Sequence, residues 1–325
     1  MVYCPSCGVR NCTANAGHNN IHLQAPLQSQ LYLLKNKHPL TLKKSVIFAC
    51  HSIRQRAISN ATVRIPMSNQ DLSRMGAARV SIEMIDGVEC IRKRGASEVE
   101  INLYQTAAPH LTGVNIPTLV KLDEKDLYIE RVPNPISLTA LRSKPRELFS
   151  QLASLHHSNY SPPFSVKTHQ WTTKATEDAL NVLRLPEYHA SKVIEIQQLS
   201  SCLFQQPNLI SGDTNDGNWG TRANGDLVLF DWERFGKGSP AIDLAPLVAC
   251  LGTLEDYREI IRQYTQYSTL LTKQELERHL VIAKCWIIIE VVNILVSRDN
   301  SDKEKYITWY RNHIPDWLDR VRHVL

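Results

Sequence analysis

Three polar side chains between residues 209 and 231 have the types and the spacing that phosphoryl transfer needs. Asp213 and Asn218 stand five positions apart after the apolar pair at 209–210, and Asp231 follows the apolar run 227–230. A tight turn between these two runs would bring the three side chains to one rim. One carboxylate there can accept a hydroxyl proton, while an amide and a second carboxylate hold magnesium against phosphates. The spacing therefore predicts a phosphotransferase site, with ordinary surface turn residues as the alternative.

These residues lie within a longer pattern. The chain reads Ser-Gly-Asp at 211–213, Asn at 218 and Phe-Asp-Trp-Glu at 230–233, and the stretch 238–245 continues it. The pattern resembles the catalytic loop and metal-binding segment of the aminoglycoside phosphotransferase and choline kinase-like family, which shares the protein-kinase fold. The stretch 238–245 resembles that family's closing Asp-Pro-x-x-Asp-Leu-Ala, with Ser in place of its first Asp. The segment that resembles the catalytic loop also has Ser211 in the position of the family's His. In the family, that His mainly supports the loop.

The resemblance implies a fold, a reaction and a role for each residue. The implied fold is α+β and bilobal, protein-kinase-like, with a small β-rich N-lobe and a large, mainly helical C-lobe. The implied activity is ATP-dependent phosphorylation of a hydroxyl on a small molecule such as an amino-alcohol, an amino-sugar or a related metabolite. Asp213 would be the catalytic base, Asn218 and Asp231 the Mg²⁺ ligands, and Asp243 a structural support. A non-catalytic nucleotide-binding regulator of the same fold is the alternative, while Asp-Trp-Glu in place of Asp-Phe-Gly disfavours a protein kinase.

The same resemblance implies a cation that binds the phosphates of ATP, together with an acidic partner. The cation belongs at the end of the strand 90–94, where both Arg92 and Lys93 are candidates. Strand alternation sends only one of these two side chains inward. Glu100, on the helix that follows, is the chosen acidic partner, with Glu98 as the alternative. A surface carboxylate that caps the helix is the simpler interpretation of Glu100.

The stretch 128–132 resembles the hinge on which adenine docks in this family. Glu130 and Val132 are its candidate nucleotide-binding positions. The resemblance implies that backbone groups, more than side chains, make the contacts there.

Two acidic residues of the C-lobe are candidates for contact with the acceptor. Asp216 lies within the catalytic loop, and Glu290 lies in an apolar stretch next to Trp286. Trp and Glu together can hold a cationic amine through cation–π and charge attraction. The alternative is that Trp286 belongs to the core and that Glu290 pairs with an arginine such as Arg298.

The hydrophobic pattern predicts the elements that position these residues. We expect an N-terminal extension over 1–60, an N-lobe over 61–132 and a C-lobe over 133–325. In the N-lobe, Ser97 is expected to cap a helix, and an Asp-Gly pair at 86–87 predicts a tight hairpin turn. The expected strands are 79–84, 88–92, 119–122, 127–130, 209–210 and 227–230, and the expected helices are 98–108, 145–157, 177–183, 190–204 and several after 241.

Composition limits the function classes. The 325 residues carry 37 Lys and Arg against 32 Asp and Glu, a net charge of +5, which is too weak to indicate nucleic-acid binding. The longest apolar stretch, 285–296, contains Glu290 and is shorter than the ~20 residues that span a bilayer, so we expect no membrane partner. The eight cysteines are mostly isolated, and several lie in apolar segments, which predicts free thiols and a cytoplasmic location. The oligomeric state leaves no mark on the sequence.

The first residues suggest a separate metal site. Cys4, Cys7, Cys12 and His18 have ligand types that can bind structural Zn²⁺. A tail that simply contains cysteines is the alternative, because structural zinc sites usually have tighter or paired spacing.

Overall fold

The computed structural model describes residues 79–325. Two expectations fall on the preceding residues and lie outside the described part: the extension over 1–60, and the zinc ligands Cys4, Cys7, Cys12 and His18.

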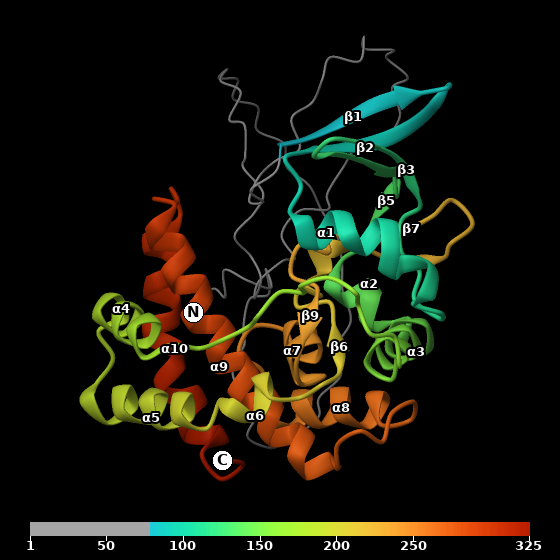
Figure 1. Ribbon diagram of the computed structural model, residues 1–325. Helices are drawn as coiled ribbons and strands as arrows, with labels where there is room; N and C mark the ends of the chain where they lie inside the picture. Colours follow the sequence, from blue (N-terminus) through green and yellow to red (C-terminus); the bar gives the residue numbers. More distant parts are fainter. Residues whose placement is uncertain (1–78) are drawn as a thin grey trace, which may run out of the picture.

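The N-terminal part of the described chain is a four-stranded antiparallel sheet in the order β1-β2-β4-β3 (Figure 1). Its strands are β1 (Arg79–Ile85), β2 (Val88–Arg94), β3 (Leu119–Asp123) and β4 (Asp126–Glu130). Asp86 and Gly87 join β1 to β2 with φ of 49° and 79°, the two left-handed positions that an Asp-Gly hairpin turn adopts. Both predicted hairpins of this sheet are confirmed.

The helix after β2 begins as predicted and then changes type. Ser97 caps α1 (Glu98–Asn102), because its side chain accepts a hydrogen bond from the backbone N–H of Glu100 at 3.2 Å. The helical path continues as a π-helical turn, η1 (Leu103–Ala107), and a 3₁₀ turn, η2 (Ala108–His110). The expected helix is therefore present over its whole length, although its second half is not α-helical.

The remainder of the chain is mainly helical, and α9 is its central helix (Figure 1). The shorter helices α4, α5, α8 and α10 all contact α9. The predicted helix 190–204 divides into two at Leu199 and Ser200, and the one predicted at 177–183 begins four residues earlier, after the cap Thr172. The helices are α2 (Leu138–Arg142), α3 (Pro145–His156), α4 (Thr173–Leu183), α5 (Glu187–Gln198), α6 (Ser201–Phe204), α7 (Ala241–Leu244), η4 (Ala245–Leu247), α8 (Leu254–Tyr264), α9 (Lys273–Ser297) and α10 (Lys303–Val321).

Helix α9 is long and apolar. Its 25 residues include a window of mean hydropathy 2.1, so in the described chain it is the one helix that could cross a membrane by length and composition. In the fold, 72% of that window is buried against the rest of the protein. The helix is therefore packed as the core element of the C-terminal part.

Short strands organise the loops that carry the polar residues. β7 (Trp219–Thr221) pairs with β8 (Leu227–Leu229) as a hairpin, and β5 (Asn134–Pro135) extends this small sheet. β6 (Leu209–Ile210) pairs instead with β9 (Gly236–Lys237). The predicted hairpin between 209–210 and 227–230 is thus corrected: each run has its own partner, and the loop that carries Asp213 and Asn218 passes from one pair to the other.

Candidate active site

Lys93 lies at the meeting point of three segments. Its Nζ is 2.6 Å from Oε1 of Glu100 on α1 and 2.8 Å from Oδ1 of Asp231, which follows β8. Glu100 is 1% exposed, and its Oε1 also accepts the backbone N–H of Trp232 at 3.3 Å. Burial lowers the pKa of Lys93, but the two carboxylates outweigh burial and raise it overall, so the amine is charged. Glu100 is therefore an internal ion-pair partner and not a surface cap, and Glu98 is exposed.

Arg92, the other candidate cation, points to the opposite face of the sheet. Its guanidinium pairs with Asp126 and Glu83 and lies 5.3 Å from the ring centre of Tyr128. Adjacent residues of a strand face opposite sides, so only one of the pair can face Glu100. The structure places Lys93 there, and the Arg92 side chain lies on the other face of the sheet.

The hinge candidates lie at the end of β4. The Glu130 carboxylate accepts two hydrogen bonds from Arg222, at 2.7 and 2.9 Å, and its backbone N–H donates to Thr118 at 2.8 Å. Arg222 holds the pKa of Glu130 below its ordinary value. The Glu130 carboxylate is thus engaged within the protein, by Arg222 and by the backbone N–H of Thr118. Among the described residues, no backbone hydrogen bond engages Val132, so its N–H and C=O are available to a nucleotide.

The loop that carries Asp213 is fixed by a buried carboxylate. Asp243 is fully buried and accepts the backbone N–H groups of Ser211 and Gly212, both at 2.8 Å. Oδ2 of Asp243 also lies 3.1 Å from Nε2 of His156 on α3. Gly212 has a φ of +76°, and a Cβ there would lie 2.5 Å from the carbonyl oxygen of Arg234. Asp243 therefore supports the loop as predicted, and position 212 requires glycine.

Asp213 is a buried carboxyl group with a strongly altered acidity. It is 6% exposed, and its Oδ1 accepts a hydrogen bond from Asn215 at 2.6 Å. Burial raises the pKa of Asp213 to about 8, even though the positive charge of Arg234 acts to lower it. A carboxyl group with a pKa near neutrality is matched to accepting a proton from a substrate hydroxyl.

Asn218 and Asp231 are held together by the hairpin. Asn218 directly precedes β7 and Asp231 is the second residue after β8. A backbone hydrogen bond of 3.0 Å from the N–H of Phe230 to the carbonyl of Asn218 joins the two ends. The Asn218 amide nitrogen donates to the carbonyl of Asp213 at 3.0 Å, which leaves the amide oxygen free. Asp231 uses one carboxylate oxygen for Lys93 and keeps the other. Two hard oxygen donors of this kind fit Mg²⁺, which typically takes one or two protein ligands beside substrate phosphates.

The side chain of Asp216 contacts a different element from the other candidates of its loop. It begins the 3₁₀ turn η3 (Asp216–Asn218), and its Oδ2 accepts the backbone N–H of Leu138 at 3.0 Å. Burial raises the pKa of Asp216 to about 6. The carboxylate caps the first turn of α2 and lines neither hollow near Asp213, so the structure does not bring the Asp216 side chain together with Asp213 and Glu290.

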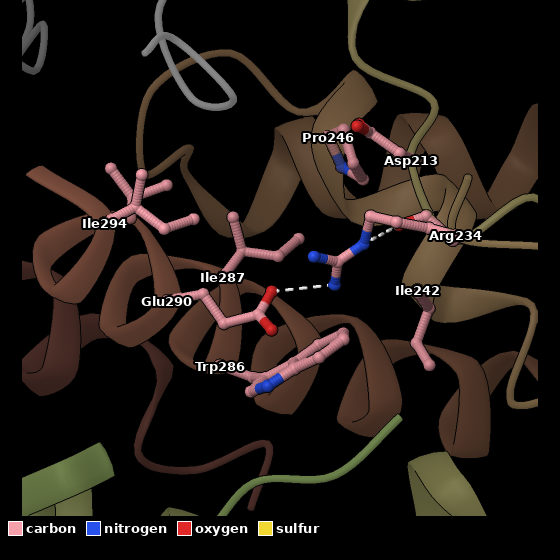
Figure 2. A pocket seen from close by; sticks show the side chains of 10 residues that line it. Asp213, Arg234, Ile242, Pro246, Trp286, Ile287, Glu290 and Ile294 are labelled. Carbon is pink, nitrogen blue, oxygen red and sulfur yellow. Dashed lines mark hydrogen bonds and ion pairs between the residues drawn. The ribbon is translucent and has the colours of Figure 1, made fainter. Parts of the chain in front are cut away.

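Glu290 faces Asp213 across an arginine that the sequence did not reveal. Figure 2 shows the guanidinium of Arg234 between the Asp213 loop and Glu290, above the ring of Trp286. Arg234 donates to the carbonyl of Gly212 at 3.0 Å and to Glu290 at 2.9 Å, and it lies 5.6 Å from the Trp286 ring centre. Trp286 is 2% exposed, so it belongs to the core. The partner of Glu290 is therefore Arg234 and not an arginine of its own helix.

Arg234 follows Asp231 by three residues, and His169 joins it from a distant loop. His169 lies 2.9 Å from the carbonyl oxygen of Arg234 and is 6% exposed. Burial and the charge of Arg234 lower the pKa of His169 to about 4, so the ring is neutral. No local pattern marks His169 in the sequence, whereas the distance of Arg234 from Asp231 could have marked it as a neighbour of the site.

Comparison with known proteins identifies the fold. No family model and no curated protein matches the sequence. Solved structures do match: a choline/ethanolamine kinase family protein from Mesorhizobium loti has a TM-score of 0.56 at 18% identity, covering 79% of this chain and 91% of that one. The aminoglycoside phosphotransferase APH(4)-Ia has a TM-score of 0.52 at 12% identity, covering 77% and 93%. An ethanolamine kinase from Plasmodium vivax has a TM-score of 0.55 at 12% identity, covering 78% and 83%.

These matches span most of the chain and nearly all of each matched structure. The chain therefore has the α+β fold of aminoglycoside phosphotransferases and choline/ethanolamine kinases, as its motifs predicted. At identities below a fifth, the likeness establishes the fold, while the chemistry must be argued from the residues themselves.

Proposed function

We propose that this protein is an ATP-dependent phosphotransferase that phosphorylates a hydroxyl group of a small molecule. The observation that carries the proposal is the position of Lys93, whose amine is within 3 Å of both Glu100 and Asp231. A charged lysine held between a helix carboxylate and a metal-type carboxylate is the arrangement that positions the phosphates of ATP in kinases. The kinase-like fold supports the same proposal.

The residues divide the work as follows. Asn218 and Asp231 would hold Mg²⁺, which supplies charge neutralisation on the transferred phosphate. Lys93 binds the phosphates, and the free backbone groups at Val132 accept the base of the nucleotide. Asp213 orients the acceptor hydroxyl and takes its proton. The acceptor oxygen bonds to the γ-phosphorus, the bond from that phosphorus to the bridging oxygen breaks, and ADP leaves with the bonding pair.

The test is release of ADP by the purified protein with a panel of alcohols, with and without Mg²⁺. The panel includes amino-alcohols and amino-sugars, the acceptor classes that the family resemblance implies. Acceptor- and Mg²⁺-dependent ADP release that Asp213→Asn removes would support the proposal. Binding of Mg²⁺-ATP without any transfer would favour the second candidate, a non-catalytic nucleotide-binding regulator, whose specific support is Ser211 in place of the family's His.

A cytoplasmic location forms part of this proposal. ATP as co-substrate suits that compartment, and no disulfide joins the cysteines of the described residues. Fractionation of cells that express the protein at native level would test it.

A further inference from the structure

A pocket beside the catalytic loop has a volume of about 290 Å³. Its walls come from the loop that carries Lys167 and His169, from Arg234, and from Trp286 and Glu290 on α9. A second, much smaller hollow of about 30 Å³ shares Arg234, Trp286 and Glu290 with it and contains Asp213. A volume near 300 Å³ is the lower end of the range for ligand pockets, so the pair of hollows suits a small metabolite with a short hydroxyl arm toward Asp213.

The wall that the two hollows share contains an ion pair, Arg234 with Glu290, that leaves hydrogen-bonding atoms of both residues free. Arg234 donates from Nε to Gly212 and from one terminal nitrogen to Oε2 of Glu290. Its other terminal nitrogen, Nη1, has no hydrogen bond to any described residue, and neither has Oε1 of Glu290. The side chains are 23% and 31% exposed, and neither atom is fully buried. One cationic and one anionic group therefore stand side by side, each with a free atom.

His169 adds an acceptor to the same wall. Its Nε2 faces the carbonyl oxygen of Arg234 at 2.9 Å, and a carbonyl can only accept, so Nε2 carries the proton. In a neutral ring Nδ1 is then an acceptor without a partner among the described residues. Lys167 lines the pocket as an exposed cation. The pocket thus presents two cationic groups that suit a carboxylate, Arg234 and Lys167, and two acceptors that suit an ammonium, Glu290 and His169.

The structure assigns this pocket a zwitterionic acceptor: we infer that the substrate is a small hydroxy amino acid, whose carboxylate binds Arg234 and whose ammonium binds Glu290. This inference rests on the proposed phosphotransferase function and specifies its substrate. The acceptor hydroxyl bonds to the γ-phosphorus of ATP, its proton passes to Asp213, and the products are an O-phosphoamino acid and ADP. Charge-assisted hydrogen bonds from both head groups give the specificity.

The same wall disfavours an acceptor with a cation alone. The face of Trp286 that would attract an ammonium is covered by Arg234, and the Trp286 ring is buried. Glu290 is already paired with Arg234, so its carboxylate attracts an added ammonium group less strongly. An acceptor that carries only an amine is also repelled by two cations of the pocket, Arg234 and Lys167. A zwitterion matches both signs of charge at once.

The test compares acceptors that differ only in their head groups. L-Serine, ethanolamine and 3-hydroxypropanoate form one set; L-homoserine, 3-aminopropan-1-ol and 4-hydroxybutanoate form a longer one. We expect kcat/KM for the amino acid of one set to exceed both of its analogues by at least about tenfold, the usual size of one charged hydrogen bond. Equal or better use of the amino-alcohol would overturn the inference and leave the phosphotransferase function standing.

The variant Glu290→Gln separates the two head-group contacts. It should lower kcat/KM for the amino acid and the amino-alcohol about 10- to 100-fold and leave the hydroxy acid within about threefold. The matched control is Glu277→Gln, which removes the same charge from the same helix. Glu277 pairs with Arg258 at 2.9 Å and does not line the pocket. The control should change none of the three acceptors, and an equal loss for all three in Glu290→Gln would overturn the inference.

Calorimetric titration of the amino acids into the protein gives a readout besides turnover. If no acceptor is phosphorylated and Mg²⁺-ATP does not bind, the proposed phosphotransferase function is wrong. The binding of amino acids to the pocket then tests the zwitterion site by itself. Binding of serine or homoserine that Glu290→Gln weakens at least about tenfold supports a zwitterion site. No binding to wild-type protein, with or without nucleotide, overturns it.

Discussion

Asp213 gives the sharpest test, because its proposed role as a base requires the ionised carboxylate, whereas its burial favours the protonated form. The pKa of about 8 lies roughly four pH units above the ordinary value of 3.8, and burial is the main cause. Between those two pH values the folded protein keeps a proton on Asp213 that the unfolded chain has released. Stability therefore falls as pH rises through this window, because the folded state binds the extra proton.

The magnitude follows from the same two pKa values. Each pH unit corresponds to about 1.4 kcal/mol, so the raised pKa of Asp213 lowers the stability of the fold by up to about 6 kcal/mol, a value approached above pH 8. Asp213→Asn has nearly the same shape, keeps an oxygen to accept the hydrogen bond from Asn215, and cannot ionise. We expect the variant to have about the wild-type free energy of unfolding at pH 4 and to be more stable by several kcal/mol at pH 8.5.

The assay is urea unfolding of both proteins at several pH values without nucleotide, together with turnover. Other ionising groups contribute equally to the two proteins, so the difference between them isolates Asp213. Turnover should fall about a hundredfold or more in the variant. Wild-type kcat/KM should rise with pH up to about 8, because the base must be ionised to accept the proton. A difference in unfolding free energy that does not change with pH would refute the buried-carboxyl argument, and near-normal turnover would remove Asp213 as the base.

Three further predictions follow from neighbouring contacts. Lys93→Met should weaken the use of ATP at least a hundredfold, measured as kcat/KM for ATP, whereas Arg92→Met on the opposite face should change it less than threefold. Gly212→Ala should cost about 2 kcal/mol or more in unfolding free energy, since φ is +76° and the new Cβ meets the Arg234 carbonyl. Asp216→Ala should lower the unfolding free energy by about 1 kcal/mol through the lost cap on α2, with the preference among acceptors unchanged; a changed preference would return it to the substrate site.

Much of the fold could be predicted because its signals are local. Alternating apolar residues mark β1, the Asp-Gly pair marks its turn, and Ser97 marks the start of α1. The positions of Asp213, Asn218 and Asp231 follow from the same kind of signal, since each stands directly beside a short strand or its loop. The predicted strand pairing of the run 209–210 was wrong. This run, β6, pairs with β9, and the spacing of residues in the sequence does not indicate which strand is its partner.

The site was harder to predict where the decisive contact is distant in sequence. Alternation shows that Arg92 and Lys93 face opposite ways, but only the packed helix α1 shows which face is internal. Glu100 has the spacing of a helix cap, yet its carboxylate turns to Lys93 because a buried amine needs a counter-charge more than an exposed helix end does. Glu290 forms its ion pair with Arg234, which is 56 positions away in the sequence, and not with the nearby Arg298.

The loop that carries Asp213 keeps its geometry without a contact from the side chain of Ser211. The bonds that hold this loop run from the backbone N–H groups of Ser211 and Gly212 to Asp243, so they do not depend on the side chain at 211. Ser211 Oγ is buried and has no partner among the described residues, which costs stability without adding a contact. His169 packs against Gly212 from the other side, where an added Cβ would meet its ring at 2.9 Å. The position of Asp213 is therefore determined by Asp243 on one side of the loop and by His169 on the other.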